Sequence, residues 1–334
     1  MRVVPQELFA TVQGEEAMGT TNSHIMKAIR FHEYGGLEVL KYEDVPRPKP
    51  QPGEVLIQVR AAAVNPFDLA VREGWLASMI PLQLPAICGV DVAGRVVATG
   101  KGVTGFSLGQ DVYGFLSRYS GAYAEYATAA SETIAPHPQT LDYVQAASVP
   151  LAATAAWQAL FEVGVVKEGQ KVLVHGGAGG VGTFAVQLAK LRGAHVLATT
   201  SGQHVEYVKQ LGADEVIDYT TTPFETVAHS VDVILDLIGG ETQQRSWGVL
   251  KVGGMLVSLL GPPSQEDAAT YGVRAAFLGA QPTTGLLKEL AHLLDTGQIK
   301  PHIGKVFPLE QARQAQELKR SGHTQGKIIL KIAD

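Results

Sequence analysis

Two patterns of apolar and polar positions divide the chain. In the first, over residues 26–150, short apolar runs alternate with turn residues. Within 55–60, Val55, Ile57 and Val59 share one face at the period of two that is typical of a strand. Further short strands are expected at 26–31, 90–99 and 122–129, with glycine-rich turns between them. Many short strands joined by such turns predict a barrel-like β domain.

In the second pattern, over residues 151–283, apolar strands alternate with helices. Strands are expected at 171–175, 195–200, 215–218, 231–235 and 255–260, and helices at 182–192 and 205–211. Ala185, Leu188 and Ala189 form the apolar stripe of the first helix, and Gly193 is its expected stop. This alternation predicts a doubly wound parallel sheet, which is the fold of a Rossmann domain.

The two ends of the chain differ from both patterns. Residues 1–25 contain acidic positions and no sustained apolar run, so we expect a disordered N-terminal extension and not a secretory or mitochondrial leader. Residues 284–334 begin with a helix at 285–295 and end with an alternating strand at 327–332. The pattern does not determine which sheet this last strand joins. The predicted fold class is therefore α/β, with a β-barrel domain and a Rossmann domain.

Charge and cysteine content narrow the class of protein. The 334 residues include 27 Lys and Arg against 32 Asp and Glu, without the basic footprint of a dedicated nucleic-acid binder. No apolar run reaches the length of about 18 residues that a membrane span needs. The single cysteine, Cys88, cannot form an intramolecular disulfide or a cysteine-based structural zinc site. These features are typical of a reducing compartment, and we expect a cytoplasmic protein.

A glycine loop is the strongest chemical signal. It follows the strand at 171–175 and precedes the helix at 182–192, and Gly177, Gly179 and Gly182 match G-x-G-x-x-G. The first glycine permits the tight turn, the second the approach of a pyrophosphate, and the third close helix–strand packing. The helix N-terminus adds N–H donors and a partial positive charge. The expected cofactor-binding residues here are Gly177, Ala178, Gly179, Gly180, Val181 and Gly182.

The next strand favours NADPH over NADH. An NAD-binding protein usually carries an Asp or Glu at the end of this strand, and its carboxylate holds the ribose hydroxyls. Here 195–204 contains no acid, and the first acidic residue is Glu206. Thr200, Ser201 and His204 can instead donate hydrogen bonds to a 2′-phosphate. No Arg or Lys accompanies them, so we expect a modest phosphate site.

Together these stretches resemble the medium-chain dehydrogenase/reductase superfamily, and within it the zinc-independent quinone oxidoreductases, which include ζ-crystallin-like proteins. Besides the glycine loop, the resemblance rests on 62–68 (AAVNPFD), 89–94 (GVDVAG), 121–126 (GAYAEY), 155–160 (AAWQAL), 211–219 (LGADEVIDY) and 326–330 (GKIIL). It implies that the first domain is a GroES-like barrel. It also implies that residues 284–334 return to that barrel.

The zinc ligands of related alcohol dehydrogenases are absent. Those enzymes carry a cysteine at the position of Asn65 and Gly-His-Glu at the position of Gly89-Val90-Asp91. Their third ligand would fall near 149–151, which is Val-Pro-Leu. Because zinc sites are built from thiolate, imidazole or carboxylate ligands, we expect no metal.

The resemblance also implies site residues. It places Asn65 and Asp68 beside the cleft between cofactor and substrate, and Trp75 on the substrate pocket where the family often has a tyrosine. Asn65 would donate from its amide, or alternatively form only the turn before Pro66; Asp68 would alternatively hold local structure. Thr154 resembles a threonine near the nicotinamide, and Tyr219 a tyrosine near the 2′-phosphate. Leu260, Phe277 and Leu278 fall where the family's backbone holds the nicotinamide amide.

The expected function is hydride transfer from NADPH to quinones or activated α,β-unsaturated carbonyls, which need no metal because they are already electrophiles. The indole of Trp75 cannot act as a proton donor, and Tyr113 and Tyr119 are weak alternatives. An enoyl-thioester reductase of the same superfamily is one alternative function. A non-catalytic NADPH- or RNA-binding protein is another. We expect a homodimer, since 253–260 resembles the edge strand through which this superfamily pairs subunits.

Overall fold

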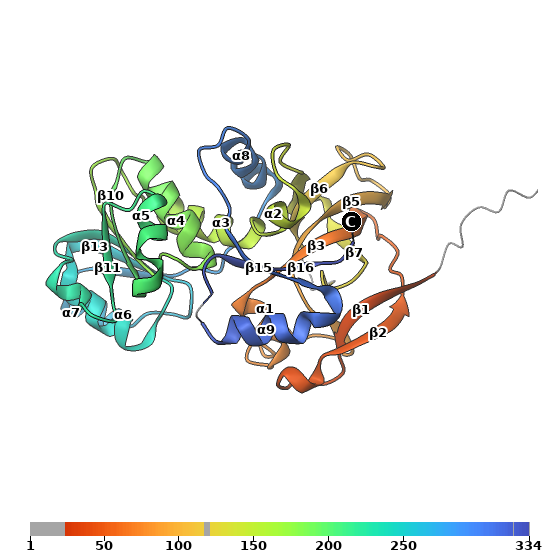
Figure 1. Ribbon diagram of the computed structural model, residues 1–334, viewed down its shortest axis with the longest axis horizontal. Helices are drawn as coiled ribbons and strands as arrows, with labels where there is room; N and C mark the ends of the chain where they lie inside the picture. The colour runs from red at the N-terminus through yellow and green to blue at the C-terminus, as the bar shows by residue number, and fades with distance from the viewer. Residues whose placement is uncertain (1–23, 117–120, 323, 334) are drawn as a thin grey trace, which may run out of the picture.

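The described residues form the two lobes seen in Figure 1, one built on a parallel sheet and the other on two mainly antiparallel sheets. The structure, a computed structural model, describes residues 24–116, 121–322 and 324–333. The expected N-terminal extension therefore lies almost entirely outside the described residues, as does Tyr119. Among the residues that are described, β1 begins at Ile25, close to the strand start expected at residue 26.

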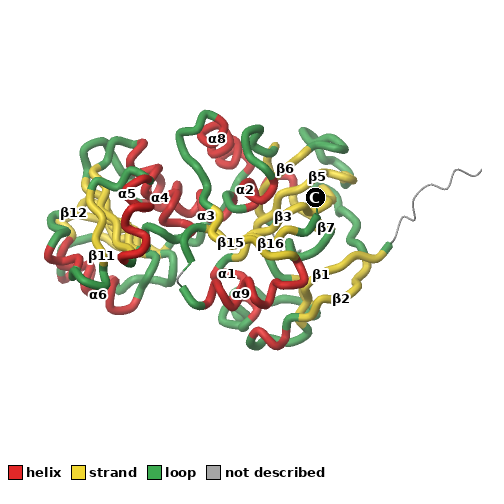
Figure 2. Tube along the Cα trace, viewed as in Figure 1, coloured by secondary structure: helices red, strands yellow, loops and turns green. Residues whose placement is uncertain are grey.

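The first lobe holds a six-stranded parallel sheet in the order β11-β10-β9-β12-β13-β14. Its strands are β9 (Lys171–His175), β10 (His195–Thr200), β11 (Glu215–Asp218), β12 (Val231–Asp236), β13 (Leu250–Ser258) and β14 (Arg274–Phe277). The helices between them are α4 (Gly180–Leu191), α5 (Val205–Gln210), α6 (Gly240–Ser246) and α7 (Gln265–Thr270). The parallel doubly wound arrangement predicted from the alternating pattern is confirmed, and Figure 2 shows its helices around the strands.

Alternate residues of these strands enter two different cores. Val172 and Val174 of β9 pack with the side chains of α3 (Pro150–Trp157), α4 and α8 (Thr284–Asp295). Leu173, between them, packs on the other face with Trp247 and with Ala268 of α7. The sheet is therefore covered on both faces, which explains why its strands are continuously apolar in the sequence.

The second lobe is the GroES-like barrel. Its seven-stranded sheet runs β15-β16-β3-β5-β6-β8, with β7 also paired to β3, and a smaller sheet runs β2-β1-β4. The strands are β1 (Ile25–Phe31), β2 (Lys41–Pro46), β3 (Glu54–Val64), β4 (Ala86–Ile87), β5 (Asp91–Thr99), β6 (Asp111–Phe115), β7 (Tyr126–Ala130), β8 (Ile134–Pro136), β15 (Ile303–Pro308) and β16 (Lys327–Lys331). Short helices α1 (Pro66–Arg72), α2 (Tyr143–Ala147) and α9 (Ala312–Arg320) complete it.

The last strand of the chain, β16, joins the barrel. β16 is antiparallel to β3, from Ile328 opposite Val64 to Lys331 opposite Ala61. Just before β16, the Gly326 amide donates to the carbonyl of Ala178 in the glycine loop, at 2.8 Å. The chain end therefore belongs to the barrel and also contacts the lobe that holds the parallel sheet.

Two expectations about individual strands need correction. The strand expected at 122–129 is regular only as β7, from Tyr126, because Ala122 to Glu125 instead make single bonds back to the 27–29 and 88–89 segments. The stretch 253–260, expected as a sheet edge, belongs to β13, which lies between β12 and β14. The edge strand on that side of the sheet is β14. An apolar run looks the same in either position, so its sequence could not separate them.

Small side chains let the two lobes approach closely. One continuous core contains Ala61 and Ala93 of the barrel strands, Ala153 and Ala156 of α3, and Ala185 of α4. α3 passes between the lobes in Figure 1. Alanines on these four elements, β3, β5, α3 and α4, keep their backbones near one another, so the lobe with the parallel sheet is packed directly against the barrel.

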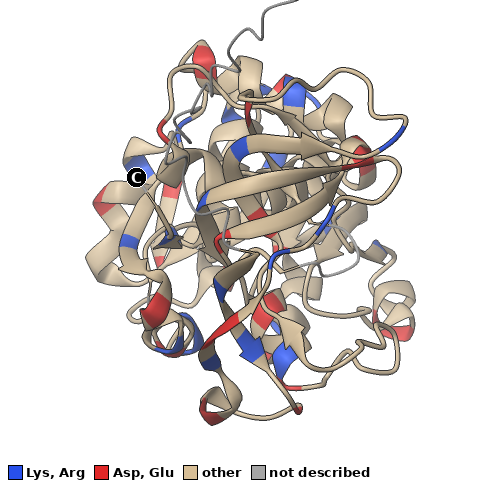
Figure 3. Cartoon of the chain, turned by 90° about the vertical axis from the view of Figure 1, so that its right-hand side faces the viewer, with Lys and Arg blue, Asp and Glu red and all other residues tan. Residues whose placement is uncertain are grey.

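Charges of both signs are interspersed on the barrel face drawn in Figure 3. Several surface cations pair with acids, including Lys27 with Asp44 at 2.8 Å and Arg95 with Asp111 at 2.8 Å. Across the parts of the chain that the structure describes, no helix is long and apolar enough to cross a membrane.

A substitution at Gly94 of β5 tests how closely the strands of the barrel pack. An added Cβ there would lie 2.1 Å from the carbonyl oxygen of Gln58, a backbone atom of the paired strand β3. We expect Gly94→Ala to lower the free energy of unfolding by about 1–3 kcal/mol, as overpacking does, in urea denaturation. Gly279→Ala is the control, because a Cβ there meets no atom within 4 Å. Equal midpoints for the two variants would contradict this packing.

Candidate active site

The glycine loop lies at the carboxyl edge of the parallel sheet, between β9 and α4, where open α/β sheets bind ligands. A Cβ on Gly182 would lie 2.2 Å from the Gly176 carbonyl oxygen, and one on Gly177 would lie 2.9 Å from the Cβ of Ala198. A Cβ on Gly179 would meet one atom only, at 3.3 Å. The outer glycines are therefore required for packing, whereas Gly179 leaves the open face that a pyrophosphate can approach.

The buried His175, at the end of β9, is hydrogen-bonded at the start of this loop. His175 Nε2 lies 3.0 Å from Ser246 Oγ, which itself donates to the carbonyl of Thr242, so the ring must donate to the serine. Its Nδ1 then accepts from the Thr199 hydroxyl at 3.2 Å, and Thr199 Oγ1 accepts from the Gly176 amide. This arrangement uses the neutral ring. Burial lowers the pKa of His175 to about 4, which favours the same form.

The residues expected near a 2′-phosphate lie at the ends of two neighbouring strands. Thr200 ends β10 and is buried, and its carbonyl accepts from the amide of Tyr219, whose side chain is exposed. Ser201 and His204 follow β10, and the buried Nδ1 of His204 has no hydrogen-bond partner among the described residues. The fold thus brings Tyr219 next to the residues from the preceding strand.

The same place holds an acid that sequence reasoning missed. Asp218 ends β11, and its Oδ1 accepts from the Thr220 amide at 3.0 Å and hydroxyl at 2.6 Å. These bonds with Thr220 lower the pKa of Asp218. Its Oδ2 lies so close to Gly202 that a Cβ there would be 2.6 Å away. Parallel strands end at one edge, so examining the end of β11 as well as β10 would have found this carboxylate.

Three residues expected near the nicotinamide follow or end strands at the same sheet edge. Leu260 follows β13 and Phe277 ends β14, and they are 55% and 45% exposed. The amide of Leu278 donates to the carbonyl of Ser258 at 2.9 Å, which joins the two strand ends. Thr154 in α3 is fully buried, and its hydroxyl has no partner among the described residues. An unpaired buried hydroxyl can accept or donate one further hydrogen bond.

Asn65, at the start of α1, belongs to a buried polar cluster. Its Nδ2 donates to Asp91 Oδ2 at 3.0 Å, and its Oδ1 accepts from the Lys327 ammonium at 2.5 Å. Lys327 also lies 3.5 Å from Asp91 Oδ2, while Asp91 Oδ1 accepts from the amide of Leu151. Burial raises the pKa of Asp91. Both its oxygens nevertheless accept from N–H donors and one lies 3.5 Å from the Lys327 ammonium, which favours the carboxylate.

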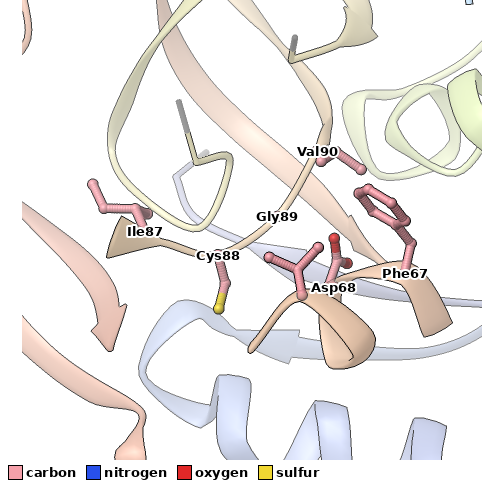
Figure 4. A pocket seen from close by; sticks show the side chains of 7 residues that line it. Phe67, Asp68, Ile87, Cys88, Gly89 and Val90 are labelled. Atoms are coloured by element: carbon pink, nitrogen blue, oxygen red, sulfur yellow. The ribbon is translucent and has the colours of Figure 1, made fainter. Parts of the chain in front are cut away.

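Asp68 lies beside this cluster and bonds to the backbone of Asn65. Its Oδ2 accepts from the backbone N–H of Asn65 at 2.8 Å and from the Tyr123 hydroxyl at 2.9 Å. Its Oδ1 has no partner among the described residues. Burial raises the pKa of Asp68 to about 7. Figure 4 shows Asp68 with Cys88 around a cavity of about 10 Å³, room for no more than one water. These contacts hold the start of α1.

Trp75 and Tyr113 have different surroundings. Trp75 follows α1 in a turn, and its side chain is 73% exposed. Tyr113 is buried in the barrel, where its hydroxyl donates to the carbonyl of Leu287 at 2.5 Å. That bond occupies the phenol proton in packing α8 against the barrel.

The residues at the expected zinc positions do come together, but they do not fit zinc. Asn65 and Asp91 lie against the Lys327 ammonium, and the Leu151 amide donates to Asp91 and not to a metal ion. Within the described residues, no group of three or more His, Cys, Asp or Glu side chains could hold a metal. Lys327 is the residue that sequence reasoning missed, although Gly326-Lys327 stands in one of the stretches that carried the resemblance.

Comparisons with known proteins define the family. Residues 51–139 match the model of the alcohol dehydrogenase GroES-like domain, and residues 211–330 match that of the zinc-binding dehydrogenases. The mouse quinone oxidoreductase is 35% identical over 93% of this chain and 99% of its own. The zebrafish mitochondrial NAD(P)H oxidoreductase RTN4IP1 is 31% identical over 92% and 88%. The quinone oxidoreductase structure from Coxiella burnetii has a TM-score of 0.86 and 36% identity, over 92% and 99%.

The chain therefore belongs to the medium-chain dehydrogenase/reductase family, in the group that contains the quinone oxidoreductases. It is an oxidoreductase that uses a nicotinamide cofactor. The resemblance stated from the sequence is confirmed, and so is the combination of a GroES-like domain with a Rossmann domain.

The buried His175 makes stability depend on pH. Its folded pKa of about 4 lies below the usual 6.5, so the unfolded chain binds a proton that the folded protein does not. We expect the contribution of this group to fall by about 2 kcal/mol between pH 7.5 and pH 5. Urea denaturation of His175→Gln should show a weaker pH dependence than the parent. The exposed His229→Gln is the control, and an identical loss in all three proteins would contradict the assignment.

Proposed function

We propose that this protein is a zinc-independent reductase that transfers a hydride from NADPH to quinones or activated α,β-unsaturated carbonyls. The observation that carries the proposal is the ammonium of Lys327 beside Asn65 and Asp91, two of the positions at which the resemblance places zinc ligands in related enzymes. Without a Lewis acid, the substrate must already be an electrophile. The quinone oxidoreductases among the relatives support the same acceptor class.

The chain's own residues have simple tasks in this reaction. NADPH, when bound, supplies the hydride, and the glycine loop holds its pyrophosphate beside the N-terminus of α4. The free N–H of Asn65 and the hydroxyl of Thr154 orient the nicotinamide ribose or the acceptor's oxygen. Trp75 is assigned to the acceptor's entrance, since it is exposed. Asp68 supports α1 and Asn65 and is not assigned a proton transfer. Solvent supplies the proton.

NADPH is proposed over NADH because Thr200, Ser201, His204 and Tyr219 offer donors to a 2′-phosphate. The carboxylate of Asp218 opposes this preference, because it lies at the end of the adjacent strand. Its oxygens are occupied by Thr220 and by the backbone near Gly202, which limits the repulsion. We therefore expect a modest preference for NADPH.

The remaining assignments are proposals of the same kind. We assign residues 26–150 to the GroES-like domain, 151–283 to the Rossmann domain and 284–334 to the return segment, after an extension over 1–25. The cytoplasm is the proposed compartment, although the names of some relatives place them in mitochondria or chloroplasts. No nucleic acid or membrane is proposed as a partner.

Steady-state oxidation of NADPH and NADH tests the activity. We expect turnover of 9,10-phenanthrenequinone, 1,4-benzoquinone or a simple alkenal, with a higher kcat/KM for NADPH than for NADH, and no loss after treatment with a chelator. Crotonyl-CoA serves as the competing acceptor. Turnover of the thioester alone would make the protein an enoyl-thioester reductase. Tight NADPH binding without turnover of any acceptor would leave a binding protein.

A homodimer is the proposed assembly, and the edge strand β14 is its proposed contact. The outer side of β14 is free to pair with a second copy, apart from a bond from Gln265 to the carbonyl of Ala275. Sedimentation velocity at micromolar concentration should give the mass of two chains. A single-chain mass across that range would contradict the assembly without affecting the proposed chemistry.

A further inference from the structure

We propose that Lys327 is a positioning residue, whose buried ammonium sets the orientation of the Asn65 amide and ties it to the glycine loop. The inference deepens the proposed function, because that function uses a free N–H of Asn65. It concerns a residue at the other end of the chain, which lies 262 positions from Asn65 and contacts it directly.

The chemistry of the three side chains allows only one orientation of the amide. An ammonium can only donate, so Asn65 must turn Oδ1 toward Lys327. A carboxylate can only accept, so Asn65 must turn Nδ2 toward Asp91. One hydrogen of Nδ2 is used in that bond, and the second has no partner among the described residues. Lys327 and Asp91 together therefore leave one donor at a defined position.

The cluster also joins the pieces that carry the other cofactor-binding residues. Asp91 accepts from Leu151 in the first turn of α3, the helix that carries Thr154. The Lys327 stem packs on Gly180, where an added Cβ would lie 2.6 Å from Cδ. Gly326, the preceding residue, donates to the loop at Ala178. A shift of Lys327 would thus move the amide relative to both the loop and Thr154.

The electrostatics explain why this lysine cannot simply be removed. The side chains of Lys327 and Asp91 are 5% and 0% exposed, so each ion is compensated chiefly by the other. Removing one partner leaves a buried unpaired charge, which is strongly destabilising, whereas replacing both with apolar groups is often tolerated. Stability and positioning can therefore be separated by comparing a single with a double variant.

The experiment compares Lys327→Met, Lys327→Arg and the double variant Lys327→Met/Asp91→Leu, with Lys305→Met as an exposed control on the neighbouring strand. We expect kcat with 9,10-phenanthrenequinone to fall on the order of 10- to 100-fold in Lys327→Met. The double variant should regain much of the thermal midpoint without regaining kcat. Lys327→Arg should retain part of kcat, since it keeps the charge. NADPH affinity should change less than kcat in all of them.

A spectroscopic readout keeps this test independent of turnover. The side-chain amide of Asn65, assigned by its loss in Asn65→Ser, should give two well-separated ¹H–¹⁵N signals that exchange slowly with solvent. Lys327→Met and the double variant should merge or shift these signals, and Lys305→Met should leave them in place. If the parent turned over no acceptor, the proposed function would fail while this readout still decided the role of Lys327.

Two results would overturn the inference. One is unchanged Asn65 signals in a folded variant that lacks Lys327. The other is a double variant that recovers kcat together with its thermal midpoint, because the pair would then act on stability alone.

Discussion

The contact between the end of the chain and the glycine loop sets the working geometry of this oxidoreductase. Gly326 bonds to the loop through its backbone, and Lys327 reaches into the barrel to Asn65 and Asp91. Because β16 is also paired along β3, the chain end belongs rigidly to the barrel. The glycine loop is therefore held by direct contacts at a fixed position relative to Asn65 and Asp91.

Small side chains make that contact possible. Alanines of β3, β5, α3 and α4 share one core across the two lobes. Gly180 supplies the space that the Lys327 stem occupies. Larger residues would separate the lobes by more than a hydrogen bond can span, since packed interiors leave no room for an added methyl group. Shape, rather than polarity, thus determines whether the polar residues of the two lobes can meet.

An ammonium group in this position acts differently from a metal ion. A catalytic zinc keeps one coordination position open for substrate, whereas Lys327 donates to Asn65 and Asp91 and is almost fully buried. It can orient an amide, but it does not offer a Lewis-acid site. Asp68 nearby has its pKa raised to about 7 by burial, so near neutral pH it adds only part of a charge. The cluster is close to charge balance, which suits a dry site for hydride transfer.

The sequence by itself determined the features whose signal is local. The period-two and strand–helix patterns, the G-x-G-x-x-G loop and the short stretches of family resemblance predicted both domains and the nicotinamide cofactor. The tertiary structure alone decided which strand forms the edge of the sheet, that Asp218 ends beside Thr200, and that Lys327 meets Asn65. These depend on pairing between distant segments. A periodic pattern records which face of an element is buried, but it does not record which partner buries it.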